Sequence, residues 1–227
     1  MKRIYRHLLT VLIALLCLQA QADDYTDGVS LYEQQDFSGA AQAFQKAADD
    51  GNAEAQCSLG LMYLNGEGVD QDYAKAMALF QQSADQDNVR AEVNLARMYA
   101  KGKGVPPSYA KAFPWFKKAA DAGYADAQYN LGILYVTGNG APRDYAQAKR
   151  LFEDAADQKN ASAQYQLGLM YFKGFGVKVD LVEAYKWLTL AGDYFDAALY
   201  RKYVAAKMSQ QEIKAAEDLA ADWKPGK

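Results

Sequence analysis

Histidine and cysteine are nearly absent from this chain of 227 residues. The only histidine is His7, and the two cysteines are Cys17 and Cys57. Without its first 22 residues the chain would keep one cysteine and no histidine. It then could not form a Ser-His-Asp triad, a Cys-His pair, a histidine-ligated zinc site or an internal disulfide. We therefore predict no catalytic residues, no metal site and no cofactor.

Long apolar runs are also scarce. The one candidate, residues 8–18, follows the basic residues Lys2, Arg3 and Arg6 and is too short to span a bilayer comfortably. The sequence Ala20-Gln21-Ala22 then offers a small-x-small cleavage pattern. We predict a signal peptide over residues 1–22, cleaved before Asp23, and no membrane-spanning helix.

Positive charge is the third shortage. Residues 23–227 carry 22 Lys and Arg side chains against 28 Asp and Glu, a net formal charge of −6. A protein that binds nucleic acid or an anionic membrane surface usually shows a basic patch or stripe. The charge balance therefore predicts neither a nucleic acid nor a membrane as a partner.

A repeat of 36 residues is what the sequence has instead. Leu59-Gly60 recurs as Leu95-Ala96, Leu131-Gly132 and Leu167-Gly168. Three further columns keep the same step: Tyr63, Tyr99, Tyr135 and Tyr171; Ala76, Ala112, Ala148 and Ala184; and Phe80, Phe116 and Phe152, closed by Leu188. A fixed period of this length is typical of a solenoid.

Each repeat reads as a pair of helices. Ala55, Leu59 and Met62 fall at i, i+4 and i+7, which is one face of a helix, and Ala76 and Phe80 do the same on a second helix. Each pair must stack on its neighbours to bury its apolar face. We predict that the small residues at the columns of Gly60, Gly132, Gly168 and Ala76 let two helix axes approach closely.

Glycine pairs separate the two helices of each repeat. They are Gly66 and Gly68, Gly102 and Gly104, Gly138 and Gly140, and Gly174 and Gly176. A dinucleotide fingerprint needs a third glycine after a strand, and a P-loop ends in G-K-S or G-K-T, so neither motif is complete. Glycine also suits the end of a helix, where the chain turns through a left-handed conformation. We predict turns, and a loss of about 1 kcal/mol for Gly68→Ala if its φ is positive.

The stretch AEAQCSLGLMYLNGEGVDQDYAKAMALFQQSA, from Ala53 to Ala84, resembles the Sel1-like repeat, a relative of the tetratricopeptide repeat. The resemblance implies an all-α fold, a right-handed α-solenoid or superhelix. We expect a tetratricopeptide-like capping hairpin over 23–51, four repeats at 52–87, 88–123, 124–159 and 160–195, and capping helices with a tail over 196–227.

A second stripe on the first helices is the candidate binding surface. It comprises Cys57, Leu61 and Leu64; Val93, Arg97 and Ala100; Tyr129, Ile133 and Val136; and Tyr165, Leu169 and Phe172. The resemblance implies that these positions line a concave groove, and the alternative is that they pack against the next first helix. The candidate partner-binding residues are Asn94, Arg97, Tyr129, Asn130, Ile133, Tyr165, Leu169 and Phe172.

These features together predict a monomeric periplasmic scaffold or adaptor that binds a protein or peptide. One alternative is a cell-wall or β-lactam-related enzyme, because Ser108 and Lys111 match the S-x-x-K motif of serine β-lactamases. The same column holds Asp72, Asp144 and Asp180, so Ser108 also reads as a helix N-cap. A secreted factor that acts on a host cell is a third possibility. Cys57 is either a buried apolar residue or a redox thiol.

Overall fold

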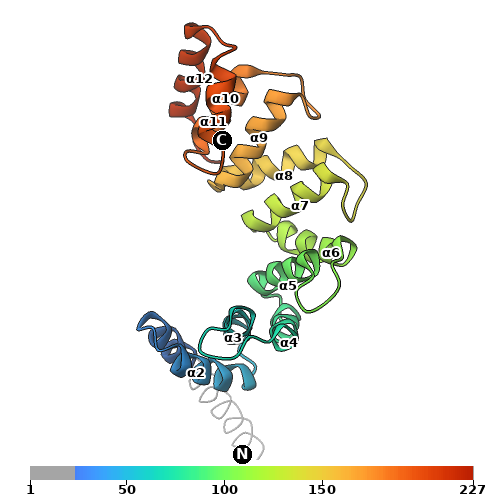
Figure 1. Ribbon diagram of the computed structural model, residues 1–227, viewed down its shortest axis with the longest axis vertical. Coiled ribbons are helices and arrows are strands. Elements are labelled where there is room, and N and C mark those ends of the chain that lie inside the picture. The colour runs from blue at the N-terminus through green and yellow to red at the C-terminus, as the bar shows by residue number, and fades with distance from the viewer. Residues whose placement is uncertain (1–23, 227) are drawn as a thin grey trace, which may run out of the picture. The chain divides into compact units, whose positions relative to one another are not determined.

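The structure is a computed structural model that describes residues 24–226, and every helix and strand element in that range is an α-helix. The predicted signal peptide lies outside the described residues. Helical residues 24–33 precede α2 (Phe37–Asp49), α3 (Ala53–Asn65), α4 (Tyr73–Ala84), α5 (Val89–Lys101), α6 (Tyr109–Asp121), α7 (Ala125–Thr137), α8 (Tyr145–Asp157), α9 (Ala161–Lys173), α10 (Leu181–Leu190), α11 (Ala197–Ala205) and α12 (Gln210–Asp222) (Figure 1). The predicted all-α solenoid of helical hairpins is confirmed.

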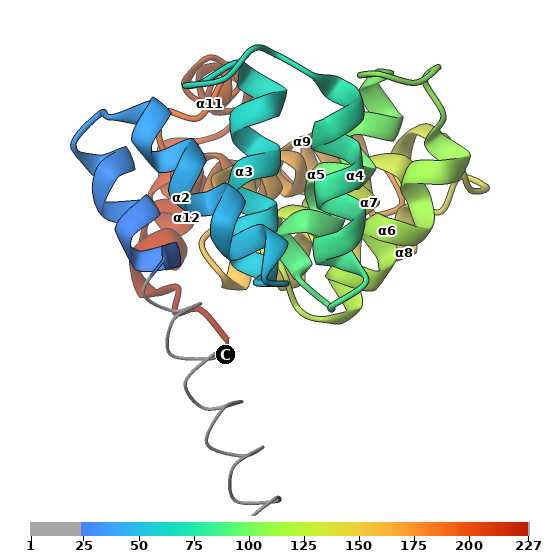
Figure 2. The same ribbon diagram turned by 90° about the horizontal axis from the view of Figure 1, so that it is seen from below.

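The chain forms two compact units, and the boundary between them follows Pro107. The first unit contains helix 24–33 and α2 to α5, whose neighbouring helices lie side by side (Figure 2). The second contains α6 to α12, and there α12 packs against α10 and closes the last hairpin. In the following text, first unit means residues 24–107 and second unit means residues 108–226.

Close helix contacts explain the small residues of the repeat. A Cβ atom placed on Gly60 would stand 2.8 Å from the Phe80 ring, and one on Gly132 would stand 2.5 Å from the Phe152 ring. Ala76, Ala112, Ala148 and Ala184 are all fully buried. Gly28 would meet Phe44 at 2.6 Å, so the first hairpin uses the same contact although its loop is shorter.

The helix starts follow a simple rule that the sequence already contains. Asn52, Asn88 and Asn160 cap first helices, and each side chain accepts a hydrogen bond from the backbone N–H three residues later. Asp72, Ser108, Asp144 and Asp180 cap second helices. Among α2 to α12, two helices start without a side-chain cap: α7, at Tyr124, and α11, at Asp196. A capping box formed by Ser209 and Glu212 starts α12.

The two glycines of each pair have different structural roles. The first one, at 66, 102, 138 or 174, is the C-cap of a first helix in the left-handed conformation. The second one also has a positive φ, but it presses against the start of the second helix of the preceding hairpin. A Cβ on Gly68 would overlap the Phe37 carbonyl, and one on Gly140 would stand 2.6 Å from the Tyr109 carbonyl oxygen. The second glycine therefore joins neighbouring hairpins, and its substitution should cost more than the 1 kcal/mol expected from φ alone.

Candidate functional site

Burial divides the predicted stripe by position. Three of the four leading residues, Cys57, Val93 and Tyr165, are buried, with 0%, 2% and 5% of their surface exposed, so they belong to the core; the fourth, Tyr129, is half-buried. The later positions keep partial exposure. Among the candidate binding residues, Asn94, Arg97, Tyr129, Asn130, Ile133, Leu169 and Phe172 are half-buried.

Tyr165 lies at the centre of an aromatic cluster in the second unit. Its ring centroid is 5.8 Å from that of Tyr194 and 5.9 Å from those of Phe195 and Tyr200. The ring of Phe172 packs edge-on against Tyr200 at 6.3 Å. Aromatic pairs in this distance range stabilise one another beyond the area they bury. The cluster therefore joins the stripe on α9 to the capping segment at the end of the second unit.

This capping segment, residues 194–203, carries three exposed large apolar side chains, and one of them, Phe195, is the most exposed of those described in the second unit. Phe195 is 76% exposed, Tyr203 53% and Leu199 44%. Phe195 also has a φ of +46°, a left-handed conformation that is uncommon for an aromatic residue and is found mostly where the surrounding structure imposes it. We call the residues Phe172, Tyr194, Phe195, Leu199, Tyr200 and Tyr203 the aromatic surface.

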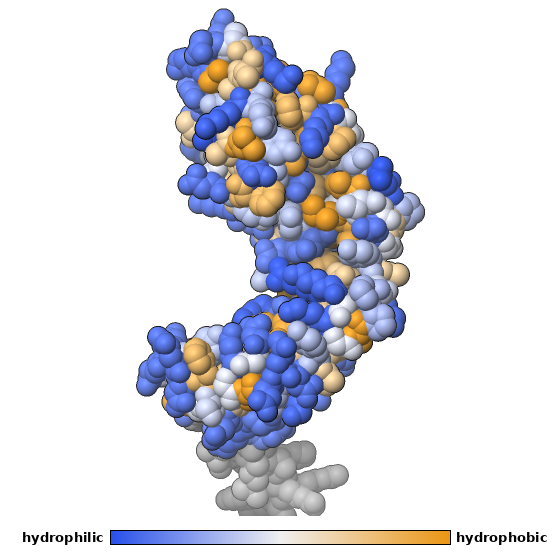
Figure 3. Space-filling model, viewed as in Figure 1, coloured by the Kyte–Doolittle hydropathy of each residue, from blue (hydrophilic) through white to orange (hydrophobic). Residues whose placement is uncertain are grey.

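The candidate binding residues predicted from the sequence did not include residues 194–203, because the 36-residue columns end at Phe195. Its composition was the available signal: residues 194–203 hold four aromatic side chains within ten positions. On the face drawn in Figure 3, hydrophobic residues interrupt the hydrophilic surface of the second unit at several places.

Tyr129 and Asn130 lie on α7, and Tyr129 lies near Tyr194 of the same segment. The Tyr129 ring packs against Phe152 at 6.1 Å, and burial, with a smaller effect of the Tyr194 hydroxyl, raises the pKa of Tyr129 to about 12. The Asn130 amide donates to the Asp126 carbonyl at 2.6 Å, one turn back on its own helix. Tyr129 is therefore a neutral side chain at neutral pH, with its ring half in the core.

Asn94 and Arg97 lie in the first unit and line a small cleft of about 140 Å³. Leu64 and Met98 provide its apolar part, and Lys101 and Lys103 add positive charge beside Arg97. These three cationic side chains give the cleft a local positive charge, although the net charge of the first unit is negative.

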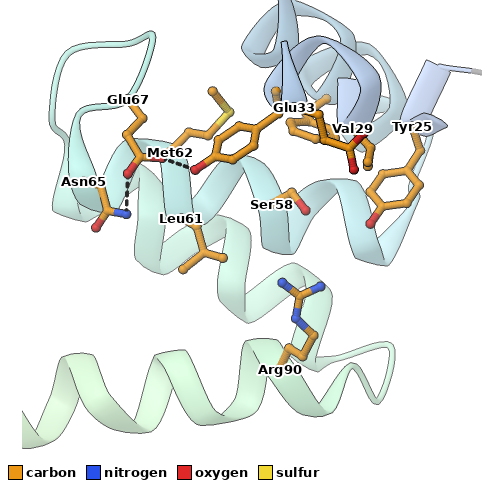
Figure 4. Close-up of a pocket in the computed structure, with 11 residues that line it drawn as sticks. Tyr25, Val29, Glu33, Ser58, Leu61, Met62, Asn65, Glu67 and Arg90 are labelled. Carbon is orange, nitrogen blue, oxygen red and sulfur yellow. Dashed lines mark hydrogen bonds between the residues drawn. The ribbon is translucent and has the colours of Figure 1, made fainter. Parts of the chain in front are cut away.

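A larger cleft of about 340 Å³ lies between helix 24–33, α3 and the start of α5 (Figure 4). Its carboxylate Glu67 accepts a hydrogen bond from the Tyr32 hydroxyl at 2.7 Å and another from the Asn65 amide at 3.0 Å. The hydrogen bond to Glu67 raises the pKa of Tyr32. The sequence prediction missed this cleft because its residues come from four helices and one loop and share no repeat column. They are Tyr25, Val29, Tyr32, Glu33, Phe44, Ser58, Leu61, Met62, Asn65, Glu67 and Arg90.

Ser108 and Cys57 are the two residues that the sequence offers for covalent or redox chemistry, and the structure gives both a structural role. Ser108 is the N-cap of α6, and its hydroxyl accepts a hydrogen bond from the Lys111 backbone N–H at 3.3 Å. Cys57 is fully buried, and burial raises the pKa of its thiol to about 11. A neutral, inaccessible thiol is a poor nucleophile. Residues 24–226 contain no group of three or more Cys, His, Asp or Glu side chains placed to hold a metal ion, and no helix in this range is long and apolar enough to cross a membrane.

Four consecutive matches connect the hairpins to one family. The sequence model of the Sel1 repeat matches residues 53–88, 89–124, 125–160 and 161–193. The chain belongs to the Sel1 repeat family. Proteins of this family generally mediate protein–protein interactions. The matched repeats begin one residue after the repeats delimited from the sequence.

Solved structures share this fold. A Sel1 repeat protein from Oxalobacter formigenes is 27% identical, with a TM-score of 0.76 over 88% of this chain and 82% of the other. A protein of Klebsiella pneumoniae is 23% identical, with a TM-score of 0.54 over 82% and 96% of the two chains. The immunity protein Pa5087 of Pseudomonas aeruginosa is 19% identical, with a TM-score of 0.54 over 90% and 83%. The last two comparisons show the fold alone. A comparison with curated proteins found no match.

Proposed function

We propose that this Sel1 repeat protein is a non-enzymatic scaffold or adaptor that binds a protein or peptide at the aromatic surface of its second unit. The observation that carries the proposal is Phe195, a large apolar side chain that is 76% exposed on a left-handed backbone. One side of its ring packs against Tyr165, but its exposed apolar surface contributes nothing to the folded monomer, whereas a partner would bury it.

Three features support an interaction surface here. The ring of Phe195 contacts those of Tyr194 and Tyr165, and Tyr200 and Phe172, on α11 and α9, belong to the same cluster. Because these rings already pack against one another, they lose little conformational freedom on binding. Tyrosine and other large aromatic side chains dominate the binding energy of many interfaces. The predicted residue Leu169 is half-buried and packs against the same core cluster as Phe172, Tyr194 and Tyr200, and the predicted residue Ile133 is half-buried on α7.

Site-specific photo-crosslinking tests the proposal in cells that produce the protein. A benzophenone amino acid replaces Phe195 or Tyr203 in the aromatic surface, and Tyr109 serves as the control, because it is 42% exposed and lies outside this surface. We expect a discrete adduct from positions 195 and 203 and none from 109. The adduct should disappear when Leu199→Asp is added. Identical adducts from all three positions, or none at all, would contradict the proposal.

Loss-of-binding variants must leave the core intact. Because Tyr165 is 5% exposed, Tyr165→Ala would remove core packing and cost about 3–5 kcal/mol of stability. The double variant Tyr129→Ala with Tyr165→Ala could therefore lose binding because it unfolds, and would not test the surface. Phe195→Ser and Tyr203→Ser change exposed side chains instead. They should weaken binding of the crosslinked partner at least about tenfold. The melting temperature serves as the folding control.

We also propose export to the periplasm, supported by the basic residues, the short apolar run and the cleavage pattern within residues 1–22. Cell fractionation with N-terminal sequencing tests it, and we expect a periplasmic chain that begins at Asp23. Recovery from the culture medium would favour the alternative of a secreted host-interaction factor. An uncleaved chain in the cytosol would contradict both.

A further inference from the structure

Negative charge is concentrated on the first unit. Residues 24–107 carry 13 Asp and Glu side chains against six Lys and Arg, a net formal charge of −7, whereas residues 108–226 carry 14 against 15. A surface with one sign of charge raises both the local concentration and the association rate of oppositely charged partners. The first unit is therefore suited to a basic partner and the second unit is not.

The cleft of Figure 4 combines this charge with an accessible apolar floor. Val29 and Leu61 are half-buried within it, above the buried side chains of Phe44 and Met62. An aliphatic side chain of a partner would bury its own surface and theirs, which is favourable at about 25 cal/mol per Å² of apolar area removed from water. The floor selects an apolar group, and the rim decides which groups can flank it.

The rim is acidic. Glu33 is exposed at its edge, and Glu67 is held in place by the Tyr32 hydroxyl and the Asn65 amide. A carboxylate can accept about four hydrogen bonds, so Glu67 still has acceptor capacity for an incoming donor. Because the two bonds already fix the carboxylate, a partner's cation would order it at little further cost.

Arg90 is the one cation among the residues that line the cleft. It extends from α5 toward the cleft, and its guanidinium lies 3.3 Å from the Glu54 carboxylate (Figure 4). Glu54 partly offsets its charge, so Arg90 does not reverse the negative balance of the rim. A second copy of this unit is a poor occupant, since it carries the same charge of −7.

We propose that the first unit holds a second, independent binding site, in which this cleft takes a basic peptide segment. An aliphatic side chain of the peptide lies on Val29 and Leu61, and a neighbouring Lys or Arg donates to Glu67 and Glu33. The site differs from the aromatic surface in its residues, its charge and its unit. The protein would then have one site that binds a partner through aromatic packing and another site that binds a basic, amphipathic peptide.

Peptide selection tests this site without knowledge of the natural partner. The chain from Asp23 onward is used to select from random 12-residue peptides displayed on phage, and recovered peptides are synthesised with a fluorescein label for anisotropy titration. We expect peptides with Lys or Arg next to Leu, Ile or Val, and weaker binding as salt is raised. Glu33→Gln with Glu67→Gln should raise the Kd of these peptides about tenfold.

Two matched variants separate the cleft from general charge attraction. Asp70→Asn with Asp85→Asn removes the same two charges from exposed positions outside the cleft and should leave the Kd nearly unchanged. Ser58→Trp fills the cleft without changing charge and should abolish binding, with the melting temperature as the folding control. Phe195→Ser should have no effect, so failure of the aromatic surface and failure of this site are distinguishable.

Three results would overturn the proposal: recovered peptides without basic enrichment, equal losses in both charge variants, or a library that yields no peptide sensitive to Ser58→Trp. A peptide that depends on Arg97 or Lys101 instead would place the selected site in the smaller, cationic cleft.

Discussion

The paired glycines offer a sharp test of how neighbouring hairpins are joined. Gly66 and Gly68 lie in one loop with φ values of +75° and +69°, so an alanine at either position has the same unfavourable backbone conformation. That conformation costs about 1 kcal/mol. If conformation were the whole effect, Gly66→Ala and Gly68→Ala would destabilise the protein equally.

The surroundings of the two glycines differ. A Cβ on Gly66 would find its nearest neighbour, Gln71 Cβ, at 3.4 Å, which is an ordinary contact. A Cβ on Gly68 would overlap the carbonyl group of Phe37, which is backbone of the preceding hairpin and cannot rotate away. Such overpacking costs typically 1–3 kcal/mol more. We therefore expect about 1 kcal/mol for Gly66→Ala and about 2–4 kcal/mol for Gly68→Ala.

Thermal unfolding followed by circular dichroism measures the difference, at about 2–4 °C per kcal/mol for a chain of this size. Gly138 and Gly140 provide an independent pair in the second unit. There a Cβ would stand 3.6 Å from Arg143 Cβ and 2.6 Å from the Tyr109 carbonyl oxygen, respectively. Equal losses within either pair would refute the proposed role of the second glycine. If a glycine variant lost binding of a phosphate-containing ligand while its melting temperature was unchanged, a phosphate-binding role of the glycine pair would be supported instead.

Three further tests concern local features of the fold. Tyr124→Asn should raise the unfolding free energy by about 1 kcal/mol, because it restores the cap that α3, α5 and α9 have. A lower melting temperature would mean that packing of the tyrosine ring stabilises the helix start more than an asparagine cap does. Ser108→Ala should lower it by about 1 kcal/mol, and a fluorescent penicillin should label neither form, whereas serine-dependent labelling would establish an enzyme. Cys57, the only thiol from Asp23 onward, should react with iodoacetamide at pH 8 only after unfolding. Because burial raises its pKa to about 11 from 9.0, its contribution to stability should be complete below pH 9 and lost as pH rises through 11.

Much of the fold could be predicted from the sequence because the same residues recur at the same positions of each repeat. The columns of Gly60, Tyr63 and Phe80 recur every 36 residues. A pattern that recurs in this way can be distinguished from a chance match, so the helical hairpin can be recognised from the sequence. Helix caps at Asp72 and Ser108 were equally readable, since a cap depends on residues within one turn. The candidate site was less predictable, because exposure depends on neighbours that no column records.

Tyr165 and Phe195 illustrate the division between sequence and tertiary structure. The sequence by itself determined that the chain builds helical hairpins and that Tyr165 belongs to a stripe on its helix. Only the tertiary structure decided that Tyr165 is buried under Tyr194 and Tyr200 while Phe195 is left in water. It also brought Glu67 and Tyr32, 35 residues apart, to the rim of one cleft. Local periodicity specifies which face of a helix is apolar, but the packing of the next element decides which part of that face remains accessible.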